Sequence, residues 1–187
     1  GYGVMGSDDA DTIIRNVVIG NNACQNRGSF GGDNSVFIGH DAGSGNWETA
    51  ASSNNVCIGR LTMTGAMNGA NANTVVGHSA GQIITNGTNN ICIGASAGDS
   101  LTTGDECTIV GYNADVDTGD RGNSIAIGAS TVTQGDNYHA IGNGNTSRVY
   151  AGDDGGGTFH GAGQSWSDKR MKENVKDIGL GLDFINK

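Results

Sequence analysis

Proline is absent from the 187 residues, and lysine and arginine together number only ten. The absence of proline suits strands that are paired on both sides, because such strands use every backbone N–H. Charged residues make up 16 % of the chain and leucine is scarce, which argues against coiled coils and helical bundles. No apolar run approaches the roughly 18 residues of a membrane-spanning helix. With 19 acidic residues and a net charge of −9, the chain lacks the basic stripe that nucleic-acid binding requires. We therefore expect neither a membrane span nor a nucleic-acid partner.

Glycine is abundant instead, with 34 residues, but it lacks the G-x-y period of collagen. The strongest pattern is an internal repeat that ends in Ile-Gly or Val-Gly. Eight copies occur at spacings of 14 to 20 residues, and their last residues are Gly20, Gly39, Gly59, Gly77, Gly94, Gly111, Gly128 and Gly142. A repeat this short cannot hold the helix pair of an ankyrin or tetratricopeptide unit. It favours a β-solenoid with one copy per coil.

Each copy is predicted to form a short strand, because the pattern Val-x-Ile places alternate side chains on one face. The Asn and Gly residues at its two ends are turn residues that tolerate left-handed backbone angles. We therefore predict an all-β protein with a lead-in over residues 1–12 and a parallel β-solenoid of about eight coils over residues 13–150. At about 4.7 Å per coil, the solenoid would rise roughly 38 Å.

The middle residue of each strand is uncharged throughout, so both faces of these strands are apolar, as in strands that are buried on both faces. One face can fill the interior of the coil, whereas a narrow solenoid has no second core for the other. We therefore expect further copies of the chain to cover it, although a loop layer of the same chain is the alternative. The first interpretation predicts an interface between copies at Val18, Phe37, Cys57, Val75, Cys92, Ile109 and Ala126.

The Asn-Ser-Val-x-Ile-Gly block resembles the left-handed parallel β-roll in the heads of trimeric autotransporter adhesins. This resemblance covers about two thirds of the chain and implies a left-handed coil and a homotrimer. The spacers 44–53 and 61–71 lengthen two of the coils, and we expect them to be surface loops that carry recognition. By residue type alone, Trp47 and Tyr112 are candidates for stacking on sugars.

A different unit is predicted to follow a glycine-rich linker over residues 151–166. Residues 167–187 hold half of the Lys and Arg of the chain and show the spacing of a short helix. The block from Ser167 to Val175 resembles the start of the intramolecular chaperone domain of phage tailspikes and tail fibres, a self-cleaving domain of the S74 peptidase type. Most of such a domain would follow Lys187, so we expect the chain to be an excerpt of a longer protein.

This second resemblance implies a self-cleavage dyad in which Ser167 is the nucleophile and Lys172 is the general base. Lysine acts as a base only when its amine is neutral, which requires burial or a nearby cation such as Arg170. Asp168 is expected to assist. The bond cut would lie on one side or the other of Ser167, and cleavage would occur once per chain, with no enzymatic turnover. The alternative is a solvated basic run that caps a helix.

No cofactor is expected from the remaining side chains. The four cysteines lack C-x-x-C spacing and are predicted to be small buried residues. His40 and His78 both follow a repeat glycine, two coils apart, which is too far to share one metal. The clusters 8–11 and 153–154 offer oxygen ligands for Ca²⁺, but neither matches an EF-hand loop, and solvated turn carboxylates are the favoured interpretation.

These observations favour a homotrimeric phage tail-fibre or tailspike segment, located extracellularly in the virion, that binds other tail proteins and a bacterial surface glycan or protein receptor. One alternative is the head of a bacterial trimeric autotransporter adhesin, which would need a coiled-coil stalk and a membrane anchor downstream. Another is a glycan depolymerase, although no recurring pair of acidic residues stands out.

Overall fold

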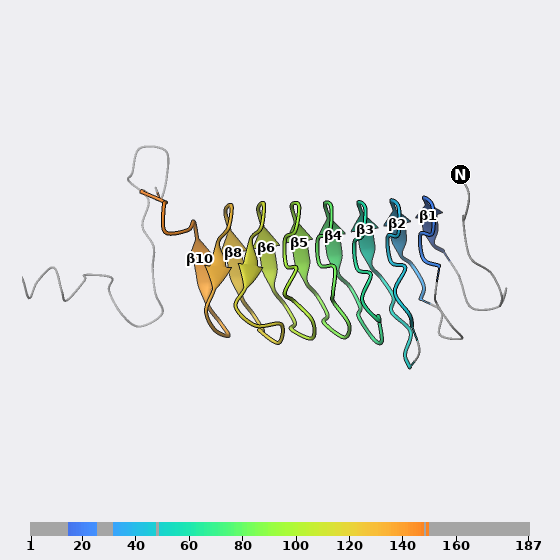
Figure 1. The fold of residues 1–187 in the computed structure, drawn as a ribbon. Helices are drawn as coiled ribbons and strands as arrows, with labels where there is room; N and C mark the ends of the chain where they lie inside the picture. The colour runs from blue at the N-terminus through green and yellow to red at the C-terminus, as the bar shows by residue number, and fades with distance from the viewer. Residues whose placement is uncertain (1–14, 26–31, 48, 148, 150–187) are drawn as a thin grey trace, which may run out of the picture. The chain divides into compact units, whose positions relative to one another are not determined.

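The computed structural model describes residues 15–25, 32–47, 49–147 and 149, which contain ten short strands and no helix. The strands are β1 (Val17–Ile19), β2 (Val36–Ile38), β3 (Val56–Ile58), β4 (Thr74–Val76), β5 (Ile91–Ile93), β6 (Thr108–Val110), β7 (Asp115–Val116), β8 (Ile125–Ile127), β9 (Val132–Thr133) and β10 (His139–Ile141). Figure 1 shows them stacked one coil after another, each joined to the next by a loop. The predicted all-β parallel solenoid is confirmed, with about seven turns.

Eight of the strands form one parallel sheet in the order β1-β2-β3-β4-β5-β6-β8-β10, and β7 and β9 form a small second sheet. Equivalent repeat residues pair across the sheet, as when Val75 lies opposite Cys92 and Cys92 lies opposite Ile109. Alignment of the sequence on the repeat glycine therefore gives the register of the sheet directly.

The repeat glycine turns the chain at the end of each strand. Gly94 has a φ of +133°, a backbone conformation that side-chain-bearing residues rarely adopt. A Cβ atom at this position would lie closer than 3.0 Å to the backbone of Gly111 on the next coil. The same obstruction recurs along the column at Gly20, Gly39, Gly59, Gly77 and Gly111. Close stacking of the coils thus requires glycine here.

Buried asparagines hold the opposite end of the strands. Asn55, Asn73 and Asn90 directly precede β3, β4 and β5, and all three are fully buried. The Oδ1 atom of Asn73 accepts the backbone N–H of Asn90 at 2.9 Å, and the Oδ1 atom of Asn90 accepts that of Cys107 at 2.8 Å. Each Nδ2 atom donates to a loop carbonyl, for example from Asn90 to Gly104 at 2.8 Å. This ladder satisfies buried backbone groups that the strands leave unpaired.

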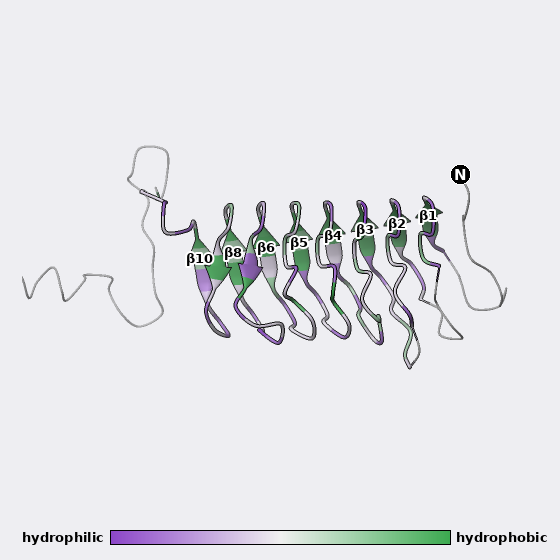
Figure 2. Cartoon of the chain, in the orientation of Figure 1, coloured by the Kyte–Doolittle hydropathy of each residue, from purple (hydrophilic) through white to green (hydrophobic). Residues whose placement is uncertain are grey.

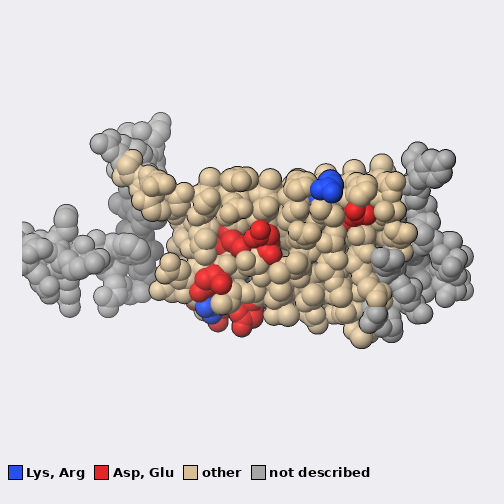
Figure 3. Space-filling model, in the orientation of Figure 1, with Lys and Arg blue, Asp and Glu red and all other residues tan. Residues whose placement is uncertain are grey.

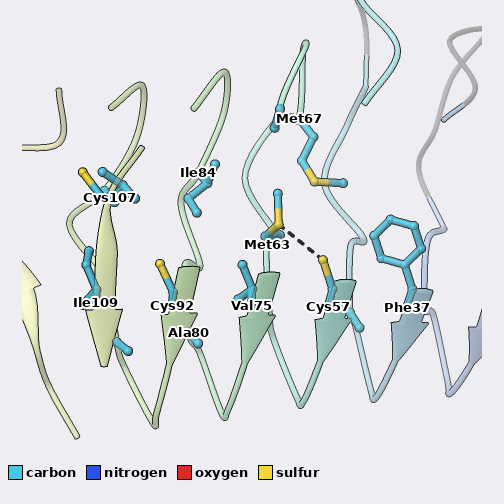
Figure 4. Packing of buried hydrophobic residues seen from close by; sticks show 14 of the residues in the cluster. Phe37, Cys57, Met63, Met67, Val75, Ala80, Ile84, Cys92, Cys107 and Ile109 are labelled. Atoms are coloured by element: carbon cyan, nitrogen blue, oxygen red, sulfur yellow. Dashed lines mark hydrogen bonds between the residues drawn. The ribbon is translucent and has the colours of Figure 1, made fainter. Parts of the chain in front are cut away.

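The core lies inside the coils, between the eight-stranded sheet and the returning loop of each coil. In Figure 4, the middle residues of the strands point toward loop residues such as Met63 and Ile84. In one of the longest coils, the middle strand position holds Phe37, whose ring centroid lies 5.9 Å from that of Trp47. The same strand position in β8, near β10, holds the much smaller Ala126. Larger core residues therefore accompany the longer coils.

The described residues from 15 to 146 belong to one compact unit. The predicted lead-in 1–12, the linker 151–166 and the chaperone-like segment 167–187, including its predicted helix, lie outside the described residues.

Candidate binding surfaces

The residues predicted to contact other copies lie in the interior of their own chain. Val18 is 8 % exposed, and the other six are fully buried: Phe37, Cys57, Val75, Cys92, Ile109 and Ala126. Their side chains already pack against the returning loops of the coils, so they offer no surface to a partner. The prediction that these residues form a trimer interface is therefore wrong, because the middle residue of each strand faces the interior of the coil.

The residues on either side of each middle position form the exposed side of the sheet. We call this surface the outer face, and it consists of two rows. The row before the middle position is Val17, Val36, Val56, Thr74, Ile91, Thr108, Ile125 and His139, and the row after it is Ile19, Ile38, Ile58, Val76, Ile93, Val110, Ile127 and Ile141. The second row contains only isoleucine and valine, and its exposed members range from 37 % at Ile58 to 54 % at Ile19. Figure 2 shows the resulting predominance of apolar colour on the strands.

The two long spacers, which were expected to be surface loops, also contribute side chains to the core. Trp47 lies in the spacer 44–53 and is fully buried, so it is not available to stack on a sugar. The spacer 61–71 places Met63 and Met67 in the core, also fully buried. Both spacers therefore supply core side chains to wide coils, and shortening them would remove part of the core.

Asp99 and Asp115 form a hydrogen-bonded carboxyl pair that the repeat pattern does not predict. They are 16 residues apart, close to one repeat, so successive coils bring them together. Burial raises the pKa of Asp115 to about 6, and a hydrogen bond with the Asp99 carboxyl acts in the same direction, opposed by hydrogen bonds from Ser100. The backbone N–H of Ser100 lies 3.2 Å from the Asp115 Oδ2 atom. Carboxyls joined by a hydrogen bond are closer together than the two carboxyls of a glycosidase, which are separated by roughly 5 Å or more.

Replacing Asp115 by asparagine is expected to stabilise the protein at neutral pH. Folding raises the pKa of Asp115 from about 4 to about 6. Its carboxyl therefore destabilises the folded state as the pH rises above about 4, and the destabilisation is complete above pH 6. Two pKa units correspond to about 3 kcal/mol, which solvent screening of this half-buried group reduces to about 1 kcal/mol. Asparagine keeps an acceptor for Ser100. Urea unfolding should therefore show a more stable variant at pH 7.5 and nearly equal stabilities at pH 4.

Asp105→Asn is the matched control, because the exposed Asp105 carboxylate also accepts hydrogen bonds from its neighbour, at 2.6 and 2.8 Å from the N–H and hydroxyl groups of Thr88. A wild-type protein and an Asp115→Asn variant with parallel stability curves between pH 4 and 7.5 would contradict the raised pKa of Asp115.

The cysteines are structural. All four are buried, and none forms a disulfide in the part of the chain that the structure describes. Burial raises the pKa of the Cys57 and Cys92 thiols, so both stay protonated and are not poised for nucleophilic chemistry. The Cys57 thiol contacts the Met63 sulfur at 3.3 Å (Figure 4). The prediction that these residues serve as small apolar core residues is confirmed.

The remaining predicted sites fall outside the described residues. These are Ser167, Asp168, Arg170 and Lys172 of the self-cleavage motif, and the acidic clusters 8–11 and 153–154. Within residues 15–25, 32–47, 49–147 and 149, no group of three or more His, Cys, Asp or Glu side chains is placed to hold a metal ion.

No protein-family model, curated protein or solved structure matches the chain. Among the described residues, there is no helix with the length and apolar character needed to cross a membrane.

Proposed function

We propose that the chain is part of a trimeric fibre that attaches to bacterial surfaces, and that its copies associate through the outer face. The observation that carries this proposal is the row of isoleucine and valine side chains along the eight-stranded sheet. Parallel sheets are usually covered on both faces. Burying the exposed half of one such side chain contributes about 1 kcal/mol, and the row repeats this gain on every coil.

Copies of the same chain suit this face better than an unrelated partner does. The two rows run the length of the sheet with one coil spacing, so an identical solenoid presents an equally long apolar surface. The resemblance to trimeric autotransporter heads supports three copies and a left-handed coil. A rigid solenoid of this kind presents its loops along the outside of a shaft.

This fibre is proposed to be a phage tail fibre or tailspike. It would be located extracellularly in the virion and joined to other tail proteins. The resemblance of residues 167–187 to a self-cleaving chaperone supports this over an adhesin head. In that role, Ser167 and Lys172 would cut the chain once, after assembly, with Asp168 and Arg170 nearby. The receptor would be a glycan or protein of the bacterial surface, bound without a cofactor.

Retention on bacterial envelopes tests this function. Fluorescently labelled wild-type protein should be retained after washing on at least one of a panel of Gram-positive and Gram-negative envelopes. Ile93→Asp places a charge on the outer face, so it should separate the copies and lower retention by about a hundredfold through lost multivalency.

Thr103→Asp is the control, since it introduces the same charge at an exposed position outside the outer face. Failure of the wild-type protein to bind any envelope would refute attachment, and equal retention of Ile93→Asp would refute attachment by a multimer.

A further inference from the structure

A short basic column runs across the coils beside the sheet. His40, Arg60 and His78 each follow the repeat glycine on successive coils, and all three are exposed. Backbone hydrogen bonds fix their alignment: the Arg60 carbonyl accepts from Ser79 at 2.8 Å, and the His40 carbonyl accepts from Leu61 at 3.0 Å. The three side chains therefore start from equivalent points about 4.8 Å apart on a rigid scaffold.

The guanidinium of Arg60 is available for an anion. Its Nη1 atom lies 3.0 Å from the His78 Nε2 atom, and because arginine only donates hydrogen bonds, that ring nitrogen is the acceptor. In the part of the chain that the structure describes, Arg60 makes no ion pair with a carboxylate. Arg121, by contrast, is held by Asp117 at 2.7 Å. A guanidinium bound only through one nitrogen retains donors for a bidentate oxyanion.

The column also carries an aromatic ring. Beyond His78 the equivalent positions are Ala95 and Tyr112, aligned by hydrogen bonds from Ser96 to the His78 carbonyl at 2.9 Å and from Asn113 to the Ala95 carbonyl at 2.9 Å. Tyr112 is 65 % exposed and lies three coils, about 14 Å, from Arg60. Cation and ring are thus separated by a span that an extended chain of sugars can cover, with His78 and the small Ala95 between them.

We propose that this column, from His40 to Tyr112, binds an acidic polysaccharide laid across the coils. An oxyanion of the polymer takes the Arg60 guanidinium, with His40 and His78 on either side, and a sugar ring stacks on Tyr112. The proposal rests on the proposed attachment function and names the class of receptor. It requires Arg60 and Tyr112 to act on the same polymer chain.

The charge of the rest of the molecule makes such binding selective. The net charge is −9, and Figure 3 shows acidic atoms mostly toward the β6–β10 end, with one basic patch among them and a second basic patch near β3 and β4. The Asp41 carboxylate lies 2.7 Å from the His40 Nδ1 atom and partly neutralises that end of the column. Polyanions are therefore repelled by most of the surface and depend on the local contact with Arg60.

Dextran sulfate and uncharged dextran of equal length are the probes, since they share a backbone and differ in charge. Immobilised wild-type protein should bind dextran sulfate and not dextran. Arg60→Gln should weaken binding at least tenfold, and Tyr112→Ala about fivefold. Arg121→Gln, which removes an arginine already paired with carboxylates, should bind as the wild type does.

Equal binding of dextran sulfate by the wild type and Arg60→Gln would overturn the proposal. It would also be overturned if free sulfate displaced the bound polymer as effectively as dextran sulfate does at the same concentration of sulfate groups. A loss at Arg121→Gln equal to that at Arg60→Gln would also overturn it, because binding would then follow net charge alone. These three outcomes would overturn the polysaccharide site but would not contradict attachment to bacterial envelopes. Conversely, a protein that binds dextran sulfate through Arg60 but binds no envelope would refute attachment and leave the polysaccharide site standing.

Discussion

Alanine at Gly94 is expected to lower the thermal unfolding midpoint by about 10 °C or more. The added Cβ would lie within 3.0 Å of the backbone of Gly111, and the φ of +133° is strained for alanine. Strain and the displacement of a neighbouring coil together cost about 3 kcal/mol or more. Circular dichroism during heating measures the effect.

Gly144→Ala is the matched control, because a Cβ atom at Gly144 would meet nothing within 4 Å. Its unfolding midpoint should stay within a degree or two of the wild type. Two variants with the same midpoint would show that the glycine column does not set the distance between coils.

Alanine at Asn90 is expected to destabilise the protein by about 4 kcal/mol. The substitution leaves the backbone N–H of Cys107 and the carbonyl of Gly104 without their partner in the buried ladder. Each buried polar group that loses its hydrogen bond costs about 1–3 kcal/mol. Urea unfolding at constant protein concentration measures the change in free energy.

The adjacent Asn89 provides the comparison. Its side chain is exposed and its φ is +59°, so alanine there costs only about 1 kcal/mol for the left-handed conformation. If Asn89→Ala and Asn90→Ala proved equally destabilising, the ladder would contribute nothing beyond backbone conformation.

The strands and their register could be predicted from the sequence because the repeat glycine marks the same corner in every coil. Alignment on Gly77 and Gly94 alone pairs Val75 with Cys92, as the structure does. The pairing is encoded locally, in a three-residue strand and its turn, and stacking then repeats it.

The identity of the buried face could not be predicted from alternation, because both faces are apolar. A second signal was present in the sizes of the residues. The middle position varies from Phe37 to Ala126, as a core that changes in width requires, whereas the position after it is isoleucine or valine in every strand of the large sheet. The core contribution of the long spacers was also hidden, since Trp47 and Met67 each stand alone in a stretch of small and polar residues.

The carboxyl pair and the basic column depend on contacts between coils. Asp99 and Asp115 differ in their distance from the repeat glycine, so alignment of the repeat does not place them together. His40 and His78 do share a repeat position, but the importance of Arg60 between them becomes clear only from its contact with His78.

The mass of the protein in solution, measured by light scattering after size-exclusion chromatography, tests the central claim most directly. Association through the outer face predicts three times the 18.9 kDa mass of one chain for the wild type. It also predicts a single-chain mass for Ile93→Asp, with an unchanged circular dichroism spectrum. A wild-type protein that remains a stable, soluble monomer would contradict the account.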